Sequence, residues 1–274
     1  MRSQRQIGIS LSLLSATLGA AWAVAAGSTA ATASAGASDR GGSANALPVG
    51  SEPVELDPAN FSLQIDNPYF PLVPGDRKIV RETDAEGGKV RGVVSVTRET
   101  KQLANGVTAR VVNDRISEDG EVVEDAREWY AQDSAGNVWY FGENTVECKN
   151  GKVAKRDGFQ AGVDGAQPGV IMPADPQVGL IFRKSYVAGE AEDAGEVFSL
   201  TERAEVPFRK FRSDVLLIKE TTPLEPVALE YAFYAQGVGP VLVVEISGGN
   251  GREELLRNQH GRQVELPAGR ERCP

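Results

Sequence analysis

Short segments rich in Val, Ile, Tyr and Phe recur along the chain and are separated by Gly, Asn, Asp or Pro. After the first 26 residues, no long stretch carries apolar residues at the 3.6-residue spacing of an amphipathic helix. This pattern is typical of strands joined by turns, so the sequence predicts an all-β fold. An antiparallel meander of about ten or more strands must protect its edges. We therefore expect a strongly curled sheet or half-barrel, with a closed barrel as the alternative.

The strand pattern occurs twice. At an offset of 104 residues, 11 of the 58 pairs from position 75 to 132 are identical, and strands and turns fall in step. Self-similarity of this kind indicates an internal duplication. We expect repeat one at about 75–143, repeat two at about 177–257, and a hairpin and loop at 144–176 between them.

The strands expected in the two repeats, with the linking hairpin and a final strand, are Arg77–Glu82, Val90–Thr97, Val107–Ile116, Val122–Gln132, Asn137–Glu143, the hairpin Val146–Ala154, Phe182–Val187, Glu196–Glu202, Asp214–Glu220, Val227–Gln236, Pro240–Ile246 and Glu253–Arg257.

The N-terminal segment has the features of an export signal. Arg2 and Arg5 precede an apolar run, Ile7–Ala26, and small residues suited to signal peptidase cleavage follow. The run is nearly long enough to span a bilayer, so an uncleaved anchor is the alternative. Residues 27–54, rich in Ala, Ser and Gly, are expected to form a disordered leader, which leaves 55–274 as a single β domain. We expect a secreted or extracytoplasmic protein.

Charge narrows the range of partners. Without Arg2 and Arg5 the chain keeps 27 basic against 38 acidic residues, a net charge near −11. An acidic surface repels phosphate backbones and anionic lipid headgroups, so nucleic acid is not an expected partner. After signal cleavage no apolar run is long enough to be an integral membrane segment.

Two cysteines, Cys148 and Cys273, lie in a chain that is expected to leave the reducing cytosol. A disulfide between them is therefore predicted, with two free thiols as the alternative. No cysteine lies near the cleavage region, so a lipobox-type lipid anchor is not expected.

The familiar catalytic motifs are missing from the sequence. Its single histidine, His260, lies in a polar stretch near the C-terminus, whereas zinc sites and Ser–His or Cys–His catalysis need a placed imidazole. No nucleophile-elbow, P-loop, zinc-protease or C-x-x-C motif occurs. No catalytic residue, cofactor or metal site is therefore predicted. Asp157 and Asp164 lack the spacing of an EF-hand, which leaves calcium only as a minor possibility.

Comparison of the two repeats indicates one candidate ligand site. Where the second repeat has apolar or aromatic residues at 217, 218, 229 and 231, the first has Asn113, Asp114, Asp125 and Arg127. The turn at 118–121 pairs positions whose numbers sum to about 240, which sets Asp114 near Asp125 and Asn113 near Arg127. Strand alternation places Asp125 and Arg127 on the face of Val123 and Trp129. Charges on an apolar face indicate a binding site. The alternatives are that Asp125 and Arg127 form a solvated ion pair at a sheet edge, or that a one-residue β-bulge turns both side chains outward.

Two neighbouring features extend this candidate site. The Gly/Pro-rich stretch Gly158–Pro173 carries apolar residues, including Phe159 and Met172, and is predicted to fold over the sheet as a lid, or otherwise to pack as a plain loop. An aromatic hairpin that contains Trp129 and Trp139 is predicted either to line a ligand pocket or to stabilise the sheet.

Two segments carry a resemblance to known proteins. In NPYFPLVPG at 67–75 and YAQGVGPV at 234–241, the chain resembles a group of uncharacterised secreted bacterial all-β proteins. The resemblance implies no established activity and no catalytic residues. A curled antiparallel sheet in an exported protein is also similar, as a fold-level analogy, to LolA-like lipid carriers.

These observations favour a non-catalytic secreted binding protein that holds a small apolar or amphipathic ligand against the concave face of the sheet, beneath Gly158–Pro173. The alternatives are a carboxylate- or metal-dependent hydrolase acting at Asp114, Asp125 and Arg127, and a cell-surface structural protein without a small ligand.

Overall fold

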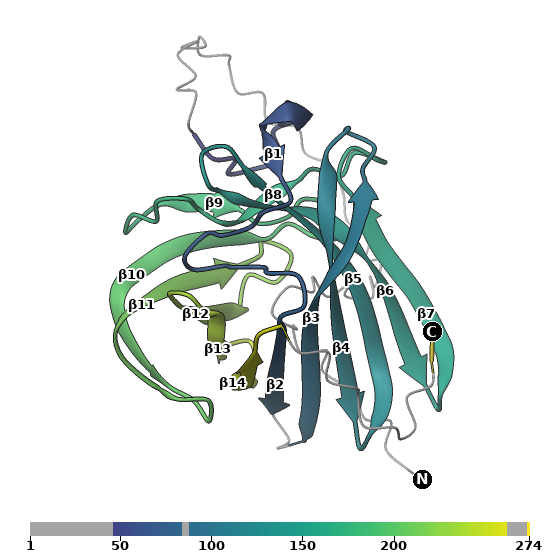
Figure 1. The fold of residues 1–274 in the computed structure, drawn as a ribbon, viewed down its shortest axis with the longest axis vertical. Coiled ribbons are helices and arrows are strands. Elements are labelled where there is room, and N and C mark those ends of the chain that lie inside the picture. The colour runs from purple at the N-terminus through teal and green to yellow at the C-terminus, as the bar shows by residue number, and fades with distance from the viewer. Residues whose placement is uncertain (1–45, 84–87, 262–272) are drawn as a thin grey trace, which may run out of the picture.

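The computed structural model describes residues 46–83, 88–261 and 273–274, and in these ranges the chain forms a single antiparallel sheet of fourteen strands (Figure 1). A short 3-10 helix, Pro58–Asn60, precedes them. The strands are β1 (Phe61–Ser62), β2 (Arg77–Thr83), β3 (Lys89–Gln102), β4 (Thr108–Glu118), β5 (Glu121–Asp133), β6 (Val138–Lys149), β7 (Lys152–Gln160), β8 (Gly169–Met172), β9 (Ile181–Arg183), β10 (Ala194–Glu205), β11 (Lys210–Thr221), β12 (Leu229–Ala235), β13 (Gly239–Ser247) and β14 (Arg252–Gln259).

The sheet is strongly curled but not closed. Its strand order is β7-β6-β5-β4-β3-β2-β14-β13-β12-β11-β10-β9, while β1 pairs with β5 and β8 pairs with β6. Strands β2–β7 form one wall and β9–β13 face it, with β14 joining the two (Figure 1). The end strands β7 and β9 are not hydrogen-bonded neighbours. The predicted curled all-β meander is confirmed, and the closed barrel is not what forms.

Each wall contains a five-stranded meander, β2–β6 in the first and β9–β13 in the second. In each, a left-handed glycine before the first strand donates its N–H to a valine carbonyl of the next long strand. Gly75 bonds Val96 and Gly179 bonds Val197, both at 2.8 Å, with φ of 97° and 87°. Such φ values cost a side-chain-bearing residue energy. The two glycines are 104 residues apart but their acceptors are 101 apart, so the contacts are similar without matching the offset, and the duplication stays a prediction.

The linking region is more regular than predicted. The expected hairpin at Val146–Ala154 forms, because β6 ends at Lys149, β7 begins at Lys152 and the two strands pair. The strand β7 then extends to Gln160, and β8 covers Gly169–Met172, so both enter the stretch expected to be a loop, Gly158–Pro173. The apolar pattern missed this because β7 is an exposed outer strand for most of its length, so no alternation marks it. Both ends of the predicted lid therefore belong to the sheet, and residues 161–168 form the connection between them.

The two walls share an apolar core. Phe70, on the segment that crosses between them, lies 5.8 Å from the ring of Tyr130 on β5 and 6.5 Å from that of Tyr234 on β12. Tyr130 and Tyr234 are both fully buried, and we call the face of the sheet that carries them the interior face. Burial of this apolar surface is the main stabilising contribution to the fold.

The ends of the domain are tied to the sheet. Cys148 and Cys273 form the predicted disulfide, with Cα atoms 6.0 Å apart across 125 positions of sequence. At the other end, residues 46–54, expected within the leader, are placed on the domain. Arg183 donates from its backbone to Pro48 and from its guanidinium to the carbonyls of Gly50 and Glu52, at 2.5 and 2.8 Å.

The predicted signal peptide at 1–26 lies outside the described residues. Within the described ranges, no helix has the length and apolar character needed to cross a bilayer.

Candidate functional site

The predicted pairing of β4 with β5 is correct, and Asp125 and Arg127 share a face with Trp129 as predicted, but that face is not the one that carries Tyr130. Asn113 lies opposite Arg127, and Asp125 lies opposite Arg115, as the sum of 240 requires. Alternation then places Asp125 and Arg127 on the face opposite Tyr130, outside the interior. There Arg115 donates to Asp125 at 2.5 Å, and Arg127 pairs with the exposed Glu99. Asp114 points the other way, into the interior.

The remaining predicted residues are also divided between surfaces. Trp129 and Trp139 share the outer face: Lys101 lies 3.9 Å from the Trp129 ring centre, and Asp133 accepts from the Trp139 indole at 2.8 Å. Phe159 packs edge-on against Tyr140 at 5.7 Å on the interior face. Met172 is fully buried in β8. The eight predicted residues therefore do not form one site, and the aromatic hairpin mainly stabilises the sheet.

A row of buried carboxyl groups crosses the interior face at one end of the first wall. Glu128 precedes Tyr130 by two positions on β5, and it lies opposite Glu143 on β6. Asp114 lies opposite Ala126 on the same face. On the far side, Glu82 of β2 lies opposite Glu253 of β14. We call Glu82, Asp114, Glu128, Glu143 and Glu253 the acidic row.

The acidic row is almost completely removed from solvent. Glu128 is 0% exposed and Asp114 4%. Among the described residues, no donor forms a hydrogen bond to either carboxylate oxygen of Glu128, to Oδ1 of Asp114 or to Oε2 of Glu143. Buried polar atoms are normally hydrogen-bonded, so several unsatisfied oxygens at one place require an explanation.

Burial and mutual repulsion change the ionisation of the row. Burial, and then the charges of Asp114 and Glu143, raise the pKa of Glu128 well above its usual value. Burial, and then the charge of Glu82, raise the pKa values of Asp114 and Glu253. Burial and the nearby Glu124 raise the pKa of Glu143 to about 8. At neutral pH the row therefore favours protons, or any other cation, over bare carboxylates.

The second wall has its own buried carboxyls, and one of them has a counter-charge. Glu220 of β11 pairs with Lys184 and accepts from the Tyr234 hydroxyl at 3.3 Å. Its cross-strand neighbour Glu230 has a pKa raised to about 8 by burial and by Glu220. In the first wall, by contrast, the charges that act most strongly on Glu128 are those of other carboxyl groups, Asp114, Glu143 and Glu124. The two walls thus differ in how their buried charges are balanced.

Sequence reasoning found only Asp114 of this row. Glu82, Glu128, Glu143 and Glu253 were not among the candidate residues. The sequence does contain an indication for Glu128. It alternates with Ala126 and Tyr130 along the strand, so it shares their face, and an apolar face is typically buried. In the described part of the chain, no three acidic, histidine or cysteine side chains are grouped as metal ligands.

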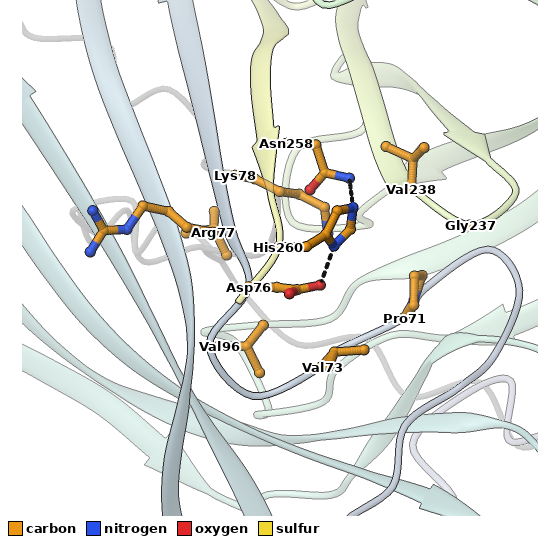
Figure 2. Close-up of a pocket in the computed structure, with 11 residues that line it drawn as sticks. Pro71, Val73, Asp76, Arg77, Lys78, Val96, Gly237, Val238, Asn258 and His260 are labelled. Carbon is orange, nitrogen blue, oxygen red and sulfur yellow. Dashed lines mark hydrogen bonds and ion pairs between the residues drawn. The ribbon is translucent and has the colours of Figure 1, made fainter. Parts of the chain in front are cut away.

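A separate cavity of about 90 Å³ lies at the other end of β2 (Figure 2). Its apolar lining consists of Pro71, Val73, Val94, Val96 and Val238. Its polar lining includes Asp76, Arg77, Lys78, Asn258 and His260. Segments far apart in sequence therefore meet here: the stretch before β2, strand β3, the turn before β13 and the end of β14.

Comparisons with known proteins identify no family. No protein-family model matches the chain, and no curated protein matches it. Among solved structures it is similar to the crystal structure of a "putative lipoprotein" from Parabacteroides distasonis, with 14% identity and a TM-score of 0.39, over 70% of this chain and 98% of that one. At that score the similarity carries no argument about function.

Proposed function

We propose that this chain is an extracytoplasmic binding protein that holds an amphipathic organic cation against the interior face of its curled sheet. The observation that carries the proposal is the fully buried carboxyl of Glu128: the charges that act on it most strongly are those of other carboxyl groups, and the neighbouring Tyr130 hydroxyl does not reach it with the geometry of an ordinary hydrogen bond. The expected export signal and the disulfide support the location, because disulfides persist in oxidising compartments.

The chemistry of the ligand follows from what surrounds Glu128. Val112 lies opposite it on β4, Tyr130 follows it on the same face, and both are fully buried in the apolar core. An ammonium group would balance the charge of one ionised carboxyl of the acidic row and donate to its unsatisfied oxygens. The hydrocarbon part of the same molecule would pack against the adjoining apolar side chains, and aromatic rings such as that of Tyr130 also attract cations.

The spread of the acidic row favours an organic cation over a single small ion. Its five carboxyls come from β2, β4, β5, β6 and β14 and lie along the wall rather than around one point. An extended amine can follow such a row, whereas a metal ion needs its ligands within about 2.6 Å of one centre.

Binding of two probes of equal chain length tests the proposal. A long-chain alkylamine should bind, as measured by calorimetry, and the fatty acid of the same length should not. Native mass spectrometry of protein purified from its own host should show a co-purifying amine.

A double variant and a control assign the binding to the row. Asp114→Asn with Glu128→Gln should weaken amine binding by at least about tenfold, since a charge-assisted hydrogen bond contributes ~1.5–3 kcal/mol. Glu99→Gln, on the outer face, should bind as the wild type does. Equal binding of the amine and the acid, or no binding of either, would exclude the proposal.

A further inference from the structure

The cavity beside β2 contains a positive charge without a matching partner. Lys78 belongs to the interior face and is 8% exposed, and its ammonium takes part in no side-chain hydrogen bond or ion pair among the residues that the structure describes. Its nearest opposite charge, Asp76, is engaged elsewhere: it accepts from His260 at 2.8 Å and from the backbone of Gly261 at 3.3 Å (Figure 2). The ammonium of Lys78 is therefore available to an anion.

The rest of the lining limits the kind of anion. Apart from Lys78, most of the enclosing surface is apolar, contributed by Pro71 and by valines of β3 and of the turn before β13. The Arg77 side chain extends away from the cavity, so it adds no second cation at the centre (Figure 2). The Asn258 amide nitrogen already contacts His260 at 3.4 Å, which leaves one of its two N–H groups for a ligand (Figure 2). A multiply charged oxyanion needs several donors, whereas a single carboxylate is matched by one ammonium and this second N–H.

The size of the cavity limits the length of the ligand. A cavity of about 150 Å³ in another protein holds benzene, and this one, at about 90 Å³, is smaller. It has room for a carboxylate and a few methylene groups.

We propose that this cavity is a binding site for a short-chain monocarboxylate, whose carboxylate pairs with Lys78 and whose hydrocarbon part contacts the valines. The site is separate from the acidic row and does not depend on the proposed function. Burial, opposed by Asp76, lowers the pKa of Lys78 to about 8, so a bound carboxylate should raise it again and draw a proton from solution.

Calorimetry with propionate, in two buffers of different ionisation enthalpy, tests this inference. We expect saturable binding with uptake of a fraction of a proton at pH 8.5 and little uptake at pH 6. The other ionisable groups that line the cavity are Asp76, Arg77 and His260. In the variant His260→Gln the uptake should persist, because Lys78 is its source.

Two variants locate the site. Lys78→Met keeps the length of the side chain and removes its charge, and it should weaken propionate binding at least about tenfold and abolish proton uptake. Val238→Phe should block binding by filling the cavity while Lys78 stays in place. Lys101→Met, on the outer face, is the matched control and should bind normally.

Three outcomes would overturn the inference. The wild type could show no propionate binding, Lys78→Met could bind as well as the wild type, or chloride and phosphate could compete as well as propionate does. A far-ultraviolet circular dichroism spectrum and thermal midpoint close to the wild type's would show that Lys78→Met is folded. If that variant does not fold, the Val238→Phe result and the proton uptake decide the question.

Discussion

Glu128 lies directly opposite Glu143 in the ladder between β5 and β6, and both carboxyls face the interior. A β-bulge creates this pairing. The register shifts between Glu128 and Tyr130, and Gly142, with φ of 113°, lets Tyr140 and Glu143 occupy one face although they are three residues apart. Like charges opposite each other repel, and burial adds to the cost. The arrangement is therefore maintained at the expense of stability, as is common at binding sites.

Stability should decrease as the pH rises. The folded-state pKa values of Glu143 and Glu230 are raised to about 8 from an ordinary 4.5, so the folded state binds more protons than the unfolded state between these values. The contribution of these two groups to the free energy of unfolding should be largest below pH 4.5. It should fall by a few kcal/mol as the pH rises to about 8. Urea unfolding followed by tryptophan fluorescence at pH 5 and 8.5 measures the difference.

The control for this pH effect is Glu143→Gln, whose amide cannot ionise. It should gain stability relative to the wild type at pH 8.5 and show a flatter dependence on pH. A wild type that becomes more stable from pH 5 to 8.5 would contradict the assignment of raised pKa values.

Gly142→Ala should be strongly destabilising. A Cβ at Gly142 would lie 2.1 Å from the carbonyl oxygen of Phe159, and the backbone there is left-handed. Gly120, with φ of 82° and no atom within 4 Å of its Cβ position, is the matched control. Gly120→Ala should lose only about 1–2 kcal/mol from backbone strain, and Gly142→Ala clearly more. Equal losses in chemical denaturation would show that the bulge tolerates a side chain.

The disulfide should contribute measurably to stability. Cys148 and Cys273 close a loop of more than a hundred residues and hold the C-terminal end against β6. Cys273→Ser should lower the free energy of unfolding by ~2–4 kcal/mol. Wild-type protein unfolded in the presence of a reductant should match this variant, and a variant as stable as the oxidised protein would contradict the prediction.

The outer-face charges should not affect ligand binding. The sequence hypothesis expects Asp125→Leu with Arg127→Tyr to abolish binding, whereas both side chains lie on the face opposite the acidic row. We therefore expect this double variant to bind the alkylamine as tightly as the wild type in calorimetry. A loss of binding from a folded double variant would restore the sequence hypothesis and place the ligand on the outer face.

Local patterning was sufficient for the strand content, the curled meander, the disulfide and the register of β4 on β5. These features depend on neighbouring residues, on alternation and on turn positions, all of which are visible in a single sequence. The predicted register, in which the numbers of paired residues add up to about 240, is also correct, since Asn113 lies opposite Arg127. The face of the sheet that becomes enclosed was not predictable to the same extent, because alternation shows which residues share a face, whereas the curl of the whole sheet decides which face is the interior.

The acidic row and the Lys78 cavity arise from contacts between distant segments. Glu82 lies opposite Glu253 only because β14 pairs with β2. Lys78 becomes buried only when the end of β14 and the turn before β13 pack near it. A glutamate in a strand is read as solvated until both walls enclose it. Short-range sequence preferences thus specify the strands, whereas the cost of burying these charges depends on how the whole sheet curls.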